Sequence, residues 1–383
     1  MRRVSAFLLT ASVLGCGVNV VTVEIKGGDG NRIRLDANDL EFGRNRLVEA
    51  GTFVFSEIKR GTYSVGVVAG TYHDRRTIEL ESAPISGVEA YSLVFQLPAG
   101  SNVPSERSGT ILFASSKTNI TKWDLFTVKA DGSGLTQLTT GREFEQHPTW
   151  SPDGKSILFT RGEVMTNIDI YVMGEDGSDA RRLTEHPERD NRPDWSPDGS
   201  RIAFVSQRDG DVAVWVMDGD GQNKRKLVKG RDPSWSPDGS QIAFVSGQFG
   251  DSDEIYLIRP DGTDMRTLTE NKKFDWFPAW SLAGDHLVFC SERFGGQELI
   301  VSTAAGDKQT RVTIAEKTYE QEPVWSPDGR AIAYAGKMKD NYEIYVLDTS
   351  GFDLDEEESP SVLPFNLTNS ADRDDKSPSW RSF

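Results

Sequence analysis

The sequence has few of the residues that form disulfide bonds or bind transition metals. Its 383 residues include 2 cysteines and 4 histidines, too few for a disulfide framework or for a zinc site built from cysteine and histidine. No apolar run reaches the roughly 20 residues that a membrane-spanning helix needs. These absences exclude a multi-spanning membrane protein, and neither a metal nor another cofactor is expected.

Basic residues are fewer than acidic residues. The chain has 43 lysines and arginines against 59 aspartates and glutamates, a net charge of −16. Because a field of that sign repels phosphate backbones, nucleic acid is not expected as a partner. Apolar residues make up 37% of the chain, and with glycine they reach about 46%, an ordinary value for a globular protein. General disorder is therefore excluded.

Residues 1–15 have the pattern of an export signal. Two arginines precede an apolar run of about 12 residues, which is shorter than a membrane span. Residues 13–16, Val-Leu-Gly-Cys, resemble the lipobox of bacterial lipoproteins, in which the signal is cut before the cysteine. The resemblance implies a lipid on Cys16 and a membrane-anchored protein of the bacterial periplasm or cell surface. The alternative is an ordinary cleaved signal, an incidental cysteine and a secreted protein. The other cysteine, Cys290, lies in a short apolar run and is expected to be buried and unreactive.

Tryptophan is absent before Trp123, and its later positions mark an internal repeat. Trp-Ser-Pro-Asp-Gly starts at Trp150, Trp195, Trp235 and Trp325. A degenerate copy starts at Trp280, and Trp380 stands three residues from the end. The spacings between these tryptophans are 45, 40, 45, 45 and 55 residues. A period near 45 residues is typical of propeller blades.

Each repeat unit predicts four strands. Ser-Pro-Asp-Gly suits a type I turn, because proline fixes φ at the second position and glycine tolerates positive φ at the fourth. This turn joins a tryptophan strand to a second strand, and a third strand and a glycine turn lead to a fourth. Six units predict an all-β, six-bladed propeller at residues 109–383. The first unit lacks a tryptophan strand and the last strand lacks a partner, so the C-terminal strand is predicted to close the first blade.

The pattern Pro-x-Trp-Ser-Pro-Asp-Gly-x-x-Ile-Ala-Phe resembles the WD-like repeats of TolB-type propellers, and the resemblance covers residues 109–383. It implies a periplasmic or secreted, non-catalytic propeller that holds protein partners. TolB itself carries an α/β domain before the propeller and a signal without a lipidation site. This sequence departs from both, so the lipoprotein partner of TolB is not carried over to it.

The segment before the propeller predicts a small β-sandwich at residues 16–98, followed by a linker at residues 99–108. Short alternating runs are separated by turn residues, as in a sandwich of two sheets. Gly61-Thr62-Tyr63, echoed by Gly70-Thr71-Tyr72, resembles carboxypeptidase-regulatory-like domains of the transthyretin type. Such domains usually serve as spacers or adhesion modules.

Catalytic patterns are sparse. The chain has no Gly-x-Ser-x-Gly elbow, so a serine hydrolase of the prolyl-oligopeptidase type is excluded. Two histidines, His147 and His186, stand beside proline in predicted blade-connecting loops, where structural hydrogen bonds are expected. Acidic residues recur at the start of five third strands: Asp124, Asp169, Glu254, Glu298 and Glu343. They are interpreted as repeated structural hydrogen bonds, with a ring that binds calcium or a cationic partner as the alternative.

The loops that join one blade to the next carry exposed aromatic and arginine residues, the types that protein interfaces favour. The predicted partner-binding residues are Arg142, Phe144, Arg189, Asn191, Phe274, Trp276, Tyr319 and Arg373. Residues 353–358 form an acidic run that lengthens the last unit, expected as a solvated loop. The sequence thus predicts an exported, lipid-anchored, non-catalytic protein that binds protein or peptide partners in the cell envelope. The alternatives are a glycan lyase or hydrolase, or a binder of glycan or cell wall, using the propeller funnel.

Overall fold

The computed structural model divides the chain into two compact units, Met1–Ser105 and Glu106–Phe383. In the first unit it describes the backbones of the strands. In the second it describes residues 109–116, 122–141, 143–163, 167–248, 252–313, 319–337, 341–349, 352, 364–368, 370 and 373–381. The predicted signal, Cys16, Arg142 and the acidic run at 353–358 lie outside the described residues. In the part of the chain that is described, no helix is long and apolar enough to cross a membrane.

The described strands of the first unit belong to two sheets. They are β1 (Val18–Lys26), β2 (Ile33–Asp36), β3 (Arg46–Val48), β4 (Thr52–Ser56), β5 (Gly61–Ala69), β6 (Tyr72–Leu80) and β7 (Val88–Gln96). One sheet has the order β4-β1-β7, with β1 and β7 parallel, and the other has the order β3-β2-β5-β6. Only the strand backbones are described here, so the packing of the two sheets as a β-sandwich stays a prediction.

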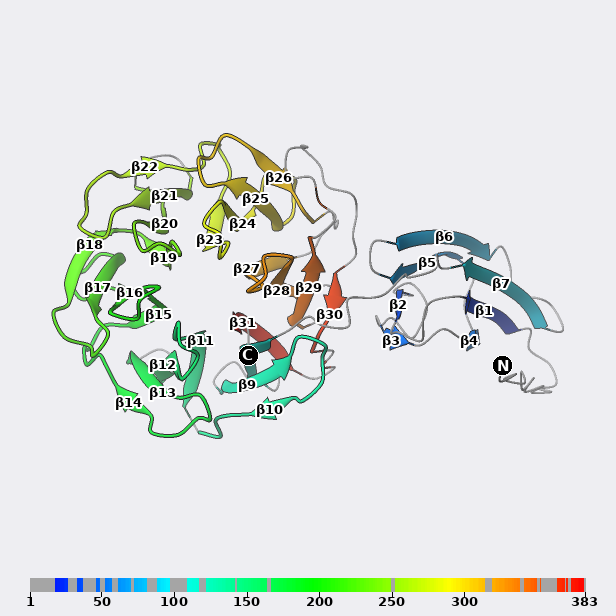
Figure 1. The fold of residues 1–383 in the computed structure, drawn as a ribbon, viewed down its shortest axis with the longest axis horizontal. Helices are drawn as coiled ribbons and strands as arrows, with labels where there is room; N and C mark the ends of the chain where they lie inside the picture. Colours follow the sequence, from blue (N-terminus) through cyan, green and yellow to red (C-terminus); the bar gives the residue numbers. More distant parts are fainter. Residues whose placement is uncertain are drawn as a thin grey trace. The chain divides into compact units, whose positions relative to one another are not determined.

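In the second unit, the described strands form six four-stranded sheets arranged as blades around a central axis (Figure 1). Blade 1 comprises β31 (Asp374–Arg381), β8 (Thr110–Ser116), β9 (Asp124–Lys129) and β10 (Thr136–Gln137). Blade 2 comprises β11 (Phe144–Trp150), β12 (Ser156–Gly162), β13 (Ile168–Gly174) and β14 (Arg181–Arg182). Blade 3 comprises β15 (Asp190–Trp195), β16 (Arg201–Ser206), β17 (Ala213–Asp218) and β18 (Arg225–Lys229).

The remaining blades repeat this order. Blade 4 comprises β19 (Arg231–Trp235), β20 (Ile242–Ser246), β21 (Glu254–Ile258) and β22 (Arg266–Thr267). Blade 5 comprises β23 (Asp275–Trp280), β24 (His286–Ser291), β25 (Glu298–Thr303) and β26 (Gln309–Arg311). Blade 6 comprises β27 (Tyr319–Trp325), β28 (Ala331–Lys337), β29 (Glu343–Asp348) and β30 (Phe365–Asn366). The predicted six-bladed all-β propeller is confirmed.

The C-terminal strand supplies the first strand of blade 1. β31 pairs antiparallel with β8, with Trp380 opposite Ile111 and Arg381 opposite Thr110. The neighbouring first strands β11 and β27 both contact β31. Strands from the two ends of the propeller sequence therefore share one sheet, which leaves no open edge at the junction.

The Ser-Pro-Asp-Gly turns are held by the same hydrogen bonds in each copy. In blade 3 the Ser196 hydroxyl donates to Asp198 at 2.6 Å, and the Gly199 amide donates to the Ser196 carbonyl at 2.8 Å. Gly199 has φ of +70°, which glycine adopts without strain. In the degenerate copy of blade 5, Ser281 donates instead to Asp285, at 2.8 Å. The aspartate has moved two positions along the chain, yet the turn is preserved.

The repeat tryptophans pack between neighbouring blades. Trp235 contacts Val214 and Val216 of blade 3 together with Ile242 and Phe244 of its own blade. Trp325 packs in the same way between residues of blade 5 and residues of blade 6. Cys290 is fully buried in that interface, and burial raises the pKa of its thiol, as expected for an unreactive cysteine. The apolar core is therefore a continuous ring of blade interfaces.

Removing residues 379–383 is expected to destabilise the whole propeller, because the deletion removes Trp380 and the last three of the eight residues of β31. Loss of a packed tryptophan alone costs roughly 3–5 kcal/mol, which corresponds to a fall of roughly 5–15 °C in the thermal midpoint. Differential scanning calorimetry should show this fall. A chain ending at Arg381, which keeps the strand, is the control. An unchanged midpoint for the shorter chain would contradict closure by β31.

Candidate functional site in the central channel

Each blade contributes one β-bulge to the central channel. In all six first strands the register shifts at an X-Pro-X sequence. The residue before each proline has φ between 49° and 55°, a strained value for residues other than glycine. We call these the bulge residues: His147, Arg192, Asp232, Phe277, Glu322 and Ser377. Because a bulge re-aims side chains, six different chemical groups meet on the axis.

The bulge residues and prolines line a cavity of about 160 Å³ together with the residue after each proline. We call the last set the post-proline residues: Thr149, Asp194, Ser234, Ala279, Val324 and Ser379. Each first strand runs from the face that carries the blade-connecting loops toward the face that carries the Ser-Pro-Asp-Gly turns. In blade 3, for example, residues 183–189 belong to this loop face and residues 196–200 to this turn face. The bulge residues therefore lie nearer the loop face than the post-proline residues.

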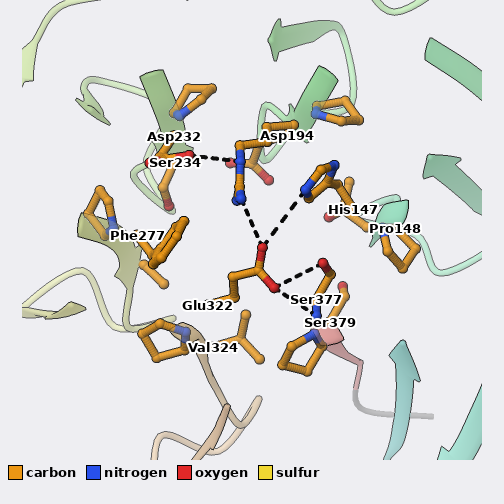
Figure 2. A pocket seen from close by; sticks show the side chains of 18 residues that line it. His147, Pro148, Asp194, Asp232, Ser234, Phe277, Glu322, Val324, Ser377 and Ser379 are labelled. Carbon is orange, nitrogen blue, oxygen red and sulfur yellow. Dashed lines mark hydrogen bonds and ion pairs between the residues drawn. The ribbon is translucent and has the colours of Figure 1, made fainter. Parts of the chain in front are cut away.

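Glu322 is the centre of a polar network that crosses the channel (Figure 2). Its Oε1 lies 3.0 Å from the Arg192 guanidinium and 3.8 Å from Nε2 of His147. Its Oε2 accepts hydrogen bonds from the Ser377 amide at 2.9 Å and hydroxyl at 3.0 Å. Arg192 also pairs with Asp232 at 2.9 Å, and its guanidinium lies over the Phe277 ring. Arg192 and Glu322 belong to blades 3 and 6, which are opposite in the ring, so their ion pair ties the two sides together.

The network fixes the charges of its members. Burial alone would raise the pKa of Glu322, but Arg192 and the other neighbouring donors and cations outweigh it and lower that pKa to about 2. Burial and the nearby Arg192 charge lower the pKa of His147 to about 3. At neutral pH the carboxylate is therefore ionised and the imidazole is neutral. The Nδ1 atom of this imidazole lies 3.1 Å from the Thr160 hydroxyl.

Asp194 lies outside this network although it lines the same channel. Its Oδ2 accepts a hydrogen bond from the backbone amide of Trp235 at 2.7 Å, which links blades 3 and 4. Burial raises the pKa of Asp194 to about 7, and the hydrogen bonds from backbone amides only partly offset that effect. Among the described residues, it forms no ion pair. Asp194 is thus a carboxyl group that changes charge near neutral pH.

Comparison with known proteins agrees with this geometry. The family described as the TolB beta propeller domain matches residues 228–368, from the end of blade 3 through blade 6. In fold, the propeller is similar to those of TolB proteins. TolB from Acinetobacter baumannii is 18% identical, with 84% of this chain and 79% of that chain covered and a TM-score of 0.60. A putative TolB from Agrobacterium tumefaciens is 18% identical, with 72% and 98% covered and a TM-score of 0.52.

The TolB-like fold also occurs within an enzyme. Kuenenia stuttgartiensis hydrazine synthase is 15% identical to this chain, with 72% of this chain and 47% of that chain covered and a TM-score of 0.57. No curated protein matches the chain in sequence. Identities this low show the fold and not the activity, so function has to be argued from the side chains.

One of the two histidines lies elsewhere than expected. His147 lies within strand β11 and not in a connecting loop, because the bulge at its proline lets the strand continue past it. It lines the central cavity. His186 does lie in a connecting loop, where its amide donates to Asp169 and its Nδ1 accepts from the Glu188 amide, as predicted. One sequence pattern could have identified the bulge residues of the channel: each of them directly precedes the proline of a Pro-x-Trp sequence.

The acidic residues of the third strands form structural bonds inside their blades, as the first interpretation had it. Asp169 accepts from Thr184 at 3.1 Å, and Glu254 accepts from Thr269 at 2.7 Å. Glu298 pairs with Arg311 at 2.6 Å, Asp124 accepts from Gln137, and Glu343 accepts from the Ser370 amide. Within the described ranges, no group of three or more His, Cys, Asp or Glu residues is placed to hold a metal ion.

The residues predicted to bind partners lie outside the central cavity. Phe144 is half-buried against the core between blades 1 and 2, and Asn191 of β15 pairs with Val205 of β16. Arg189 is half-buried, and Arg373 lies over the Phe126 ring. Phe274 and Tyr319 are exposed, at 42% and 54%, and Trp276 stacks on Phe274 with ring centroids 5.6 Å apart. Their role in binding stays a prediction.

Sequence reasoning missed one aromatic residue of this region. Phe294, 51% exposed, lies in the loop between β24 and β25 of blade 5. The ends of that loop touch the predicted residues, since the Glu292 amide donates to the Phe274 carbonyl and the Glu320 amide donates to the Gln297 carbonyl. We call Phe274, Trp276, Phe294 and Tyr319 the aromatic rim. It lies on the loop face at blades 5 and 6.

Replacing Glu322 by glutamine should destabilise the propeller, because Arg192 then loses one of its two buried counter-ions. Breaking such a pair costs roughly 3–5 kcal/mol. The pKa of Glu322 is lowered on folding, so its contribution is present above pH about 4.5 and is lost as pH falls toward 2. Thermal unfolding of Glu322→Gln and wild type should therefore differ most at pH 6–7 and converge near pH 2.

The matched control is Glu185→Gln, whose carboxylate is 86% exposed. Its midpoint should stay within the range of about 0.5 kcal/mol that is usual for surface changes. If Glu322→Gln behaved like this control at pH 7, the cross-channel ion pair would not stabilise the ring.

Proposed function

We propose that the protein is exported, carries a lipid on Cys16 and uses its TolB-like propeller to bind protein or peptide partners in the cell envelope. The loop face at blades 5 and 6 is the binding surface. The observation that carries this proposal is the aromatic rim, where Phe294 lies in one loop and the three other aromatic residues lie on the segments beside it. Interfaces are enriched in such rings, because they bury much area for little loss of side-chain entropy.

The rim contains both a rigid anchor and accessible contact groups. Trp276 is held in place because its indole N–H donates to Asp253 at 3.1 Å and its ring packs on the core between blades 4 and 5. Phe274 stacks on it, while Phe294 is covered on one side by the Arg311 guanidinium. Preorganised aromatic groups lose little freedom when a partner docks, which favours binding.

The enzyme alternative has one observation in its favour: a histidine, an arginine and three carboxylates converge in the channel. The His147 and Glu322 side chains are poor proton carriers, because efficient general acids and bases have a pKa near the working pH. Asp194, with a pKa of about 7, meets that condition, but it lies outside their network. His147 and Glu322 titrate near 3 and 2. A cavity of about 160 Å³ is also smaller than the roughly 300–1,000 Å³ of common ligand pockets. The geometry thus favours a structural role for this ion-pair network over a catalytic role.

A double variant, Phe274→Ala with Tyr319→Ala, tests the binding surface. Both side chains are largely exposed, so the fold should persist and partner binding should weaken. Truncating hot-spot aromatics costs about 2 kcal/mol or more each, so recovery of a partner from envelope extracts should fall at least about tenfold. Quantitative mass spectrometry of pull-downs with the mature protein measures this recovery.

The control is Leu282→Ala, which removes a 63% exposed apolar side chain from the opposite face. It should leave recovery unchanged. Equal recovery by the rim variant and wild type would refute this surface. Selective loss with Leu282→Ala would place the interface on the turn face. Wild-type binding to purified cell-wall glycan, lost in the rim variant, would favour the glycan-binding alternative.

Lipid attachment can be tested separately. Cells grown with a labelled fatty acid should incorporate the label into the wild-type protein and not into Cys16→Ala, because the cysteine of a lipobox carries the lipid. Cys290→Ala is the matched control, since that thiol is buried in the propeller, and it should be labelled like wild type. Label that persists in Cys16→Ala would contradict the anchor.

A further inference from the structure

A second cavity opens on the turn face of the propeller. It has a volume of about 220 Å³ and meets the first cavity at the post-proline residues. Turn residues such as Pro197 and Pro237 form its outer lining. Five of the repeat tryptophans also line it: Trp195, Trp235, Trp280, Trp325 and Trp380. We call the turn-face end of the channel the vestibule.

Asp194 is the one ionisable residue among those that line this vestibule, all of which are described. The other post-proline residues that line it are uncharged. The other titratable groups of the channel are His147, which is neutral, and the charged residues Arg192, Asp232, Glu322 and Lys376. The bulge residues among them are engaged with one another, and Lys376 lies 3.7 Å from the centre of the Tyr342 ring. None of these forms an ion pair with Asp194. Its charge is thus unbalanced within a partly buried space.

We propose that the turn-face vestibule binds a monovalent organic cation, a primary ammonium or guanidinium group, with the Asp194 carboxylate as its counter-ion. The net charge of −16 favours approach of a cation. One carboxylate does not suit a divalent metal such as calcium, which takes six to eight oxygens. The site lies on the opposite face from the proposed partner surface, so each can fail without the other.

The same chemistry could come from a free amine or from a lysine or arginine side chain of a polypeptide. A volume of about 220 Å³ admits the end of such a chain but not a folded segment. Binding also competes with a proton, because burial raises the pKa of Asp194 to about 7. The cation binds the ionised form, so affinity should rise with pH up to about 8 and then level off.

Titration of the mature full-length protein with n-butylammonium, methylguanidinium and the peptide acetyl-Gly-Lys-Gly-amide tests the site. Calorimetry, together with the indole N–H signals in ¹⁵N NMR spectra, reports binding. We expect the affinity of the protein for the cation to fall at least about tenfold in Asp194→Asn. In wild type, this affinity should fall by about tenfold for each pH unit below 7. Asparagine keeps an oxygen for the Trp235 amide and removes only the charge.

Asp179→Asn is the matched control. Asp179 is exposed on the turn side of blade 2 with φ of 55°, a conformation that asparagine adopts readily. It should bind all probes like wild type. Thermal scans check folding: the raised pKa of Asp194 costs stability as pH rises from about 4 to 7, so Asp194→Asn should match wild type at pH 4 and exceed it at pH 8.

Tighter binding of the lysine peptide than of the free amines would identify a polypeptide ligand. Tighter binding of the free amines would identify a small amine. Both results support the site. Equal affinity of wild type and Asp194→Asn, affinity that does not change between pH 6 and 8.5, or no binding of any probe would overturn it.

Discussion

The pairing of β31 with β8 is the contact on which the rest of the propeller depends. A blade buries its faces only against its two neighbours, so a ring with one unpaired end would expose an apolar interface and two strand edges. Placing Trp380 opposite Ile111 completes blade 1 and gives each blade two neighbours. The repeat tryptophans can then all pack in equivalent interfaces, although the ends of the sequence are far apart along the chain.

Closure also brings six strained bulges to one axis. Proline in a first strand cannot donate to the ladder, and the register shift beside it directs the preceding side chain inward. In a repeat with identical residues this would make a symmetric pore. Here the six bulge residues differ. Arg192 pairs with Glu322 and Asp232, and these ion pairs connect blades across the channel. Strain at the bulges is thereby offset by ion pairs between blades.

The ion-pair network of the channel lies between two chemically different faces of the propeller, the loop face and the turn face. Toward the loop face, charges are paired, and the exposed aromatic residues of the rim are the accessible feature. Toward the turn face, a single carboxylate lines the vestibule without a cation beside it. Titration behaviour follows the same division: Glu322 stays ionised far below neutral pH, whereas Asp194 changes charge near it. The proposed partner surface and the proposed cation site rest on this asymmetry.

The sequence by itself determined the fold, because Trp-Ser-Pro-Asp-Gly encodes a turn and an apolar strand locally, and its period counts the blades. It also indicated that the chain closes through Trp380 and that the third-strand acids bond within their blades. Only the tertiary structure decided which side chains meet. His147, Arg192 and Glu322 are 45 and 130 residues apart in sequence, and no local pattern reports a contact across a ring. The same holds for Asp194, whose raised pKa arises from burial by residues of other blades.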